Sequence, residues 1–222
     1  MQVDLNADLG ESTRPESVRA DDSVLTFVSS ANLAAGMHAG TPRSIREACR
    51  KTVHRGLRVG ALVGYRDLLG GGDRYIDVDY SDLSAELIYQ VGAVEALAFS
   101  ERGRLSYVRP HGALARMAGR RRDHGEAILA AVSSYDGGLP LVVQHDSPLL
   151  AMAHDAGLRV IVEYPATSVD RMRTSVGLIA ADGHPEGSVS LHLDPVTAPV
   201  VVKTLRELGH TAGVPTAARR SI

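Results

Sequence analysis

The chain has 222 residues, of which 44% are hydrophobic and 23% charged, and its formal net charge is -2. This composition is typical of a globular protein with a buried core, and the net charge excludes an overall positive field that would attract nucleic acid or an anionic membrane. The single cysteine, Cys49, excludes an internal disulfide and a cysteine-rich zinc site, and without a membrane-length apolar run or a signal-peptide core we expect a cytoplasmic protein.

Strand-like and helix-like patterns alternate along the chain. The opening VDLNAD alternates apolar with polar residues, as a strand does. A polar connection through residue 22 precedes a second apolar stretch, which starts at Val24. Thr41-Pro42 is typical of a helix N-cap and first helical position, and Gly56 is typical of a helix end. Further strands are predicted at 57–64, 105–112, 139–145, 158–164 and 187–194, and further helices from Ser81, near 121–134, from Ser147-Pro148 and around 197–209.

This succession of strand-helix units indicates an α/β fold with a parallel sheet. About seven such units favour a closed sheet, and near-continuous apolar strands are typical of strands with both faces buried. We therefore predict a seven-stranded (β/α) barrel-like parallel sheet in a single domain over residues 1–211, followed by a polar tail at 212–222. Neither a G-x-G-x-x-G nor a P-loop motif follows any predicted strand, so we expect no phosphate-binding loop in this chain.

Polar side chains gather where the predicted strands end. Because the carboxyl ends of parallel strands face one mouth, these side chains are expected to converge, and convergent ionisable groups can shift one another's pKa as acid-base catalysis requires. The residues are Asp8, Glu11, Asn32, His38, Tyr65, Asp67, Arg109, His111, His145, Asp146, Glu163, His192 and Asp194.

Two histidines stand out among these residues because glycines flank them. His38 lies in GMHAG and His111 in RPHGA, where the backbone can approach a ligand closely. Asp4 and Asn6 share a strand face with Asp8, since residues two apart point the same way. His124 lies in a polar stretch and is expected to be exposed, and GGGD at 70–73 is expected to be a flexible turn.

Six segments carry a family resemblance: VDLNADLGES at 3–12, SSANLAAGMHAGTP at 29–42, VGALVGYRDL at 59–68, YQVGAVEAL at 89–97, VRPHGAL at 108–114 and VSLHLD at 189–194. In this order they resemble the LamB/YcsF family, whose members include the A subunit of the prokaryotic 5-oxoprolinase. The resemblance implies a seven-stranded β/α barrel related to polysaccharide-deacetylase-type barrels. It also implies hydrolysis of the cyclic amide 5-oxoproline with ATP cleavage, in which two partner subunits use the ATP and this chain binds no cofactor directly.

The resemblance extends to site residues and has departures. It implies polar site residues at Asp4, Asn6, Asp8, Glu11, Asn32, His38, His111, His192 and Asp194. The family motif resembling GAHPGYPD reads GALVGYRD here, so that Leu62 replaces its histidine, and Arg109 replaces the lysine before Pro-His. Related deacetylase barrels use an Asp-His-His metal set. Because leucine can neither bind a metal nor move a proton, we expect no bound metal.

We therefore predict a divergent amidohydrolase, similar to the A subunit of 5-oxoprolinase, that acts on a small lactam. Asp8 would be the general base, and His38 and His111 would donate protons or hydrogen bonds to the carbonyl. Predicted substrate-binding residues are Asp4, Asn6, Glu11, Asn32, Tyr65, Glu163, His192, Asp194 and Arg109, the last for a substrate carboxylate.

Two alternatives remain open at the level of the sequence. One is a paralogue recruited to a biosynthetic pathway as a metal-independent lyase, isomerase or cyclase, as the changes at Leu62 and Arg109 suggest. The other is a non-catalytic subunit that binds a ligand or scaffolds its partners. A homo-oligomer is compatible with each of the three hypotheses.

Overall fold

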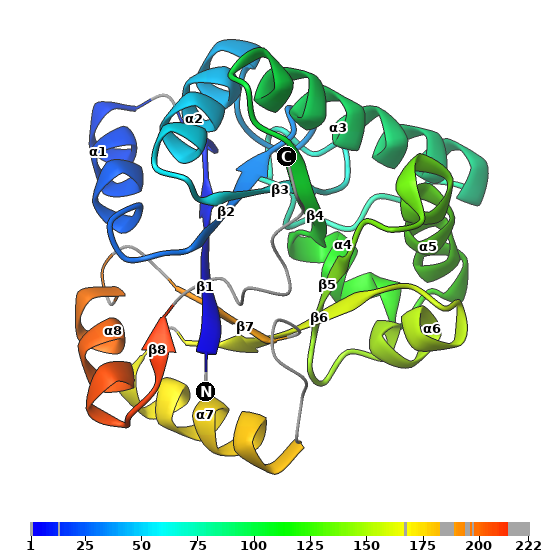
Figure 1. Ribbon diagram of the computed structural model, residues 1–222. Helices are drawn as coiled ribbons and strands as arrows, with labels where there is room; N and C mark the ends of the chain where they lie inside the picture. The colour runs from blue at the N-terminus through cyan, green and yellow to red at the C-terminus, as the bar shows by residue number, and fades with distance from the viewer. Residues whose placement is uncertain are drawn as a thin grey trace.

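The computed structural model describes residues 2–12, 14–166, 168–182, 189–193, 196 and 198–212. Figure 1 shows the strands gathered at the centre of the molecule with helices around them. In chain order the elements are β1 (Gln2–Leu9), α1 (Pro15–Val24), β2 (Ser30–Ala34), α2 (Pro42–His54), β3 (Arg58–Val63), α3 (Tyr80–Ser100), β4 (Leu105–Pro110), α4 (Gly112–Ala118), α5 (Arg122–Asp136), β5 (Leu141–Gln144), α6 (Leu149–Asp155), β6 (Val160–Pro165), α7 (Val169–Asp182), β7 (Val189–His192), α8 (Ala198–Glu207) and β8 (Thr211–Ala212).

The strands form one parallel sheet that curls on itself. Their order is β2-β3-β4-β5-β6-β7-β1-β8, and β1 pairs with β2 as well as with β7. The expected α/β class and curled parallel sheet are confirmed. The strand count differs from the expected seven, because the two-residue strand β8 adds to β1 beside Gln2 and Val3. Ala212, expected to begin the tail, therefore belongs to the sheet, and residues 213–222 lie outside the described part of the chain.

Local sequence signals explain where several helices begin. Thr41 and Ser44 form a capping box at the start of α2, and Asp79 caps α3 by accepting a hydrogen bond from the backbone N–H of Asp82. α1 was predicted as a connection, because among its described side chains only Val24 is buried and its apolar spacing is weak. Among the described residues, the helices are all too short or too polar to cross a membrane.

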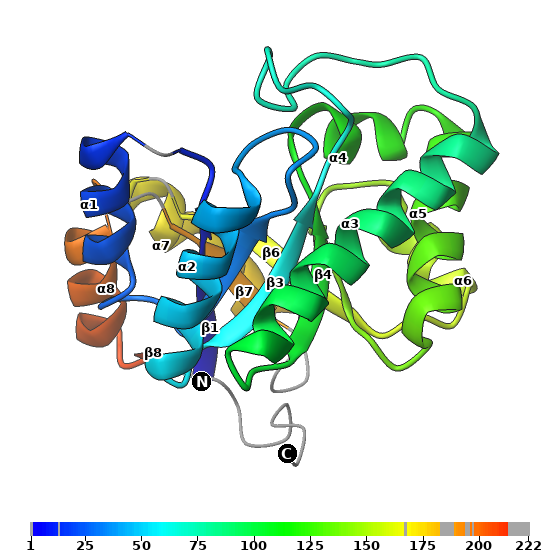
Figure 2. The same cartoon turned by 90° about the horizontal axis from the view of Figure 1, so that it is seen from above.

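One long connection shapes the mouth of the sheet. Residues 64–79 link β3 to α3 and project beyond the rest of the molecule on the side where α4 lies (Figure 2). The connection is anchored by Asp67, which accepts hydrogen bonds from Arg74 and from the backbone of Gly70, and by a hydrogen bond from the N–H of Ala113 to the carbonyl of Gly72. The carboxyl ends of β1, β2 and β4 therefore open beneath this segment.

Candidate active site

Alternation along β1 sends its polar side chains into the interior of the curled sheet. Asn6 donates a hydrogen bond of 3.0 Å to Glu163 of β6, a strand that does not neighbour β1 in the sheet. Asn32 on β2 donates to the side-chain oxygens of Asn6 at 2.6 Å and Asp8 at 2.8 Å. The Tyr107 hydroxyl donates to the Asn32 oxygen at 2.7 Å, which fixes the orientation of that amide. Asn6, Asn32 and Glu163 are buried, so this is an interior polar network.

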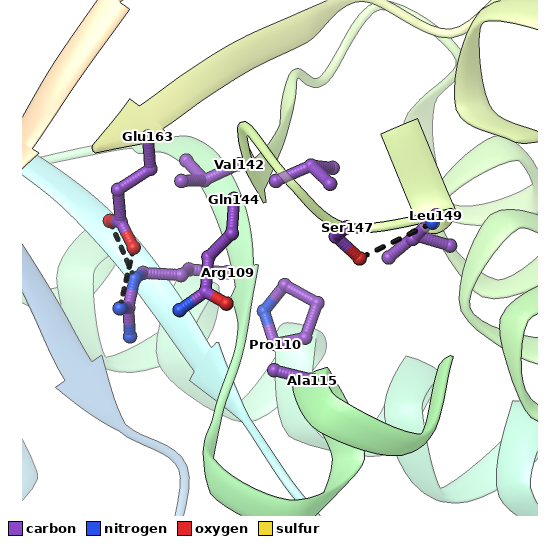
Figure 3. Close-up of a pocket in the computed structure, with 9 residues that line it drawn as sticks. Arg109, Pro110, Ala115, Val142, Gln144, Ser147, Leu149 and Glu163 are labelled. Carbon is purple, nitrogen blue, oxygen red and sulfur yellow. Dashed lines mark hydrogen bonds and ion pairs between the residues drawn. The ribbon is translucent and has the colours of Figure 1, made fainter. Parts of the chain in front are cut away.

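Arg109 joins the carboxylates of this network. Its Nε and Nη2 atoms donate to the two oxygens of Glu163 at 2.8 and 2.7 Å, a bidentate pair that Figure 3 shows at the edge of a small pocket. Its Nη1 atom lies 3.2 Å from Asp8 Oδ1. Burial opposes the charge, but these two carboxylates raise the pKa of Arg109 above its ordinary value. Arg109 is predicted to pair with a substrate carboxylate, and in this structure it pairs with the carboxylates of Asp8 and Glu163.

His111 stands between two carboxylates at the mouth. Its Nδ1 atom lies 3.7 Å from Asp8 Oδ2, its Nε2 atom lies 3.7 Å from Glu11 Oε1, and Nε2 also contacts the carbonyl oxygen of Gly71 at 3.0 Å. Burial lowers the pKa of His111, but Asp8 and then Glu11 outweigh it and raise this pKa above the ordinary value. Burial and the charge of Asp8 raise the pKa of Glu11. These shifts bring a histidine and a carboxyl group towards the range used in acid-base chemistry.

His38 is packed against His111 and is almost completely buried. The two rings are stacked with their centroids 4.5 Å apart and an interplanar angle of 19°. His38 is 1% exposed, and neither of its ring nitrogens has a hydrogen-bond partner among the described residues. Its Nε2 atom lies 3.9 Å from Glu11 Oε1. Burial, reinforced by His111, lowers the pKa of His38 to about 4.

A cavity of about 420 Å³ opens above these side chains, which is the size range of sites for small molecules. Two glycines allow the histidines to pack beneath it. A Cβ on Gly72, which has φ +82°, would lie 2.8 Å from His111 Cδ2 and 3.0 Å from His38 Cβ, and one on Gly64 would lie 3.0 Å from His38 Nδ1. The cavity is lined by Glu11, His38, Ala39, Gly40, Leu68, Gly71, Asp73 and His111.

Several predicted site residues lie elsewhere. Asp4 accepts hydrogen bonds of 2.6 Å from the hydroxyls of Ser29 and Ser30, earlier along β1 than the mouth. Tyr65 is 0% exposed, and its hydroxyl contacts His124 Nδ1 at 2.6 Å in the core. The expectation that His124 is exposed is therefore wrong, because Tyr65 and a backbone carbonyl satisfy both ring nitrogens.

The last predicted strand is only partly described. His192 is paired with Asn6 through the backbone of β7, and its side chain lies outside the described part of the structure, as does Asp194. Sequence reasoning missed Gly71 and Tyr107. The GGGD segment is predicted to be only a flexible turn, although its carbonyl contacts His111. The positive φ angles of Gly71 and Gly72 are the reason for glycine there, and the run of glycines was the available signal.

Leu62, which replaces the family histidine, lies inside the sheet. It is 0% exposed, and its backbone is in register with Ala34 on one side and Arg109 on the other. The expectation of no metal depended on a ligand set that includes position 62. The carboxylate and imidazoles that the structure brings together at Glu11, His38 and His111 do not involve that position.

The chain matches the LamB/YcsF family over residues 3–192. It is 47% identical over 161 residues to the 5-oxoprolinase A subunit of Mycobacterium marinum, a match that covers 72% of this chain and 64% of that protein, so the chain spans somewhat less than two thirds of that relative. It is 43% identical over 183 residues to the 5-oxoprolinase A subunit of Nocardia farcinica, covering 82% of this chain and 72% of that protein.

Solved structures show the same fold. A lactam utilization protein from Thermus thermophilus superposes with a TM-score of 0.86 at 32% identity, covering 97% of this chain and all of that one. A putative cellobiose-phosphate cleavage protein from Enterococcus faecalis has a TM-score of 0.61 at 12% identity, and covers 96% of this chain and 97% of that one, which is a likeness of fold alone.

Proposed function

Because the chain belongs to the LamB/YcsF family, we propose that it hydrolyses a small lactam, with 5-oxoproline as the first candidate substrate. The names of its relatives, which are 5-oxoprolinase subunits and a lactam utilization protein, support this substrate class. The observation that carries the proposal is the placement of Asp8 at the mouth, between the guanidinium of Arg109 and the imidazole of His111. This carboxylate is oriented by three neighbours, and one of them, His111 at 3.7 Å, lines a cavity of suitable size.

In the proposed reaction Asp8 is the general base. It takes a proton from a water molecule, whose oxygen adds to the lactam carbonyl carbon and forms a tetrahedral intermediate. His38 and His111, stacked below the cavity, stabilise the negative charge that develops on the carbonyl oxygen. His111 then gives a proton to the ring nitrogen as the C–N bond breaks, and the proton on Asp8 returns to His111 across their 3.7 Å separation. The products are the open amino acid and the restored site.

Arg109 and the interior amides act on Asp8 rather than on the substrate. The guanidinium and the Asn32 side chain both contact Asp8 Oδ1, so the carboxylate has a fixed orientation before substrate binds. The word subunit in the names of the relatives supports a complex of several subunits. We further propose that two partner subunits and ATP are required, and that the reaction takes place in the cytoplasm.

The changes at Leu62 and Arg109 favour one second candidate. A paralogue that has taken up another small molecule, as a lyase, isomerase or cyclase, would use the same Asp8, His38 and His111. The two candidates differ in substrate and in their need for ATP.

Isothermal titration with 5-oxoproline and other lactams, beside an assay of glutamate release with and without ATP and the two partner subunits, tests the proposal. Binding of a lactam and its hydrolysis support it. Turnover of a different small molecule without ATP favours the second candidate. Lactam binding without turnover under any condition would indicate a non-catalytic role and overturn the proposed activity.

A further inference from the structure

A carboxylate and two imidazoles converge at one corner of the cavity. Glu11 comes from the end of β1, His38 from the loop after β2 and His111 from the end of β4. One donor atom from each lies within 4.8 Å of the other two, and Glu11 Oε1 is 3.7 Å from His111 Nε2 and 3.9 Å from His38 Nε2. Three chain segments that are far apart in sequence thus direct nitrogen and oxygen donors at one point.

His38 supplies a second, independent observation. Its side chain is fully buried, yet neither ring nitrogen has a hydrogen-bond partner among the described residues. An unpaired buried imidazole is costly, since it has lost its hydrogen bonds to water without replacement. Its Nε2 atom faces Glu11 and the cavity, where a ligand can reach it. The buried ring is therefore incomplete without a ligand at Nε2.

We infer that Glu11, His38 and His111 bind one divalent transition-metal ion, of the class to which zinc belongs. Two imidazoles and one carboxylate form a set that zinc accepts in catalytic sites, where a fourth position stays open to water or substrate. The all-oxygen sites that calcium and magnesium prefer are a poorer description of this set. Zinc bonds to these donors are about 2.0–2.2 Å long, which places tetrahedral ligand atoms about 3.4 Å apart. Closing the present separations, which are at most 4.8 Å, by about 1.4 Å or less therefore completes the site.

The surroundings of His111 suit a ligand role. Its Nδ1 atom faces Asp8, and a carboxylate behind a ligating histidine orients the ring and increases its basicity. The contact between Nε2 and the Gly71 carbonyl is the one that an ion would replace. Glu11 can adjust most easily, because its side chain is 39% exposed.

This inference deepens the proposed function and rests on it only in sharing the cavity. In the lactam reaction the two histidines stabilise the charge on the carbonyl oxygen. An ion held by the same two histidines would do so as a Lewis acid, and Asp8 would remain the base. With His111 Nε2 bound to the ion, the proton that Asp8 takes from water would pass to the ring nitrogen without going through His111. Binding of the ion itself can be measured without any lactam.

The test uses the full chain, purified without a polyhistidine tag and dialysed against a chelator. Zinc affinity is measured by competition with a chromogenic chelator, and cobalt is added to report coordination through its absorption spectrum. We expect one ion per chain, and we expect Glu11→Gln and His111→Gln each to weaken zinc at least about tenfold. His145→Gln is the matched control, since His145 stacks on Tyr164 outside the trio, and its affinity should equal that of the unmodified chain.

Failure of either proposal can be recognised separately. Absence of saturable binding at one ion per chain, or equal zinc affinity in Glu11→Gln, overturns the metal site, and circular dichroism confirms that this surface variant is folded. Lactam binding by a chain that binds no zinc overturns the metal site and leaves the proposed function standing. Zinc binding by a chain that neither binds nor hydrolyses a lactam overturns the proposed function and leaves the metal site standing.

Discussion

The pair between Arg109 and Glu163 offers a quantitative test of how the interior network is held. Both side chains are buried, with 8% and 3% exposure, and two parallel hydrogen bonds of 2.8 and 2.7 Å join them. The substitution Arg109→Met keeps an unbranched chain of similar reach but removes the charge. It leaves Glu163 and Asp8 without their cation in the interior of the sheet.

Removing one partner of a buried pair costs about 3–5 kcal/mol, because the other charge stays buried without its counter-charge. This is a large part of the roughly 5–15 kcal/mol that stabilises a typical domain. With a urea dependence of about 2 kcal/mol per molar, the unfolding midpoint of Arg109→Met should fall by roughly 1.5–2.5 M. Since Glu163→Met in the same chain removes the carboxylate, the double variant should be more stable than the sum of the single losses predicts.

Urea unfolding, followed by far-ultraviolet circular dichroism, is measured for the unmodified chain, the two single variants and the double variant, which together form a double-mutant cycle. Arg122→Met is the matched control, because its partner Glu126 is on the surface of α5, and its midpoint should stay at the wild-type value. Strictly additive losses in the double variant, or a loss at Arg109 no larger than at Arg122, would refute the reasoning that the pair is a buried, coupled unit.

Three further predictions concern the site and the core. Asp8→Asn and His111→Ala should each abolish lactam turnover while the circular dichroism spectrum is unchanged, and full turnover by either would exclude its assigned role. Gly72→Ala should lower the free energy of unfolding in urea by about 1–3 kcal/mol and weaken lactam binding, because its Cβ meets both site histidines. Gly56→Ala, with φ +68° and open space around its Cβ, is the control and should lower that free energy by about 1 kcal/mol. Equal losses in the two variants would contradict the clash. Burial raises the pKa of Cys49 to about 12, so a thiol reagent at pH 8 should label it only after unfolding in urea, and rapid labelling of the native chain would disprove this burial.

Short-range patterns predicted the part of the site that lies on regular strands. The alternation in VDLNAD placed Asn6 and Asp8 on one face, and both are in the interior network. The same alternation included Asp4, but which hydroxyls a side chain meets depends on the neighbouring strand, and β2 presents Ser30 there, with Ser29 just before it. Register between strands is not visible in a single sequence.

The features that the sequence did not predict depend mostly on contacts between distant segments. Tyr65 and His124 are 59 positions apart, and nothing near either residue indicates the other. The role of Gly71 depends on a backbone carbonyl, which every residue has, so its contact with His111 carries no sequence signature. α1 was missed for a different reason: it covers the sheet with so few buried side chains that no helical period appears.

The bridge from Arg109 to Glu163 also bears on how the sheet is closed. Strands β4 and β5 are in register through a single residue pair, Val108 with Leu141, whereas β5 and β6 share four. The guanidinium on β4 reaches past β5 to the carboxylate on β6. It therefore holds β4 and β6 together from the interior, on either side of the sparse β4–β5 pairing. Backbone amides of β5 should therefore exchange with deuterium sooner than those of β2 and β3. Removing the pair between Arg109 and Glu163 should speed that exchange and should also release Asp8. Arg109, which orients Asp8, thus also links β4 to β6 across the interior of the sheet.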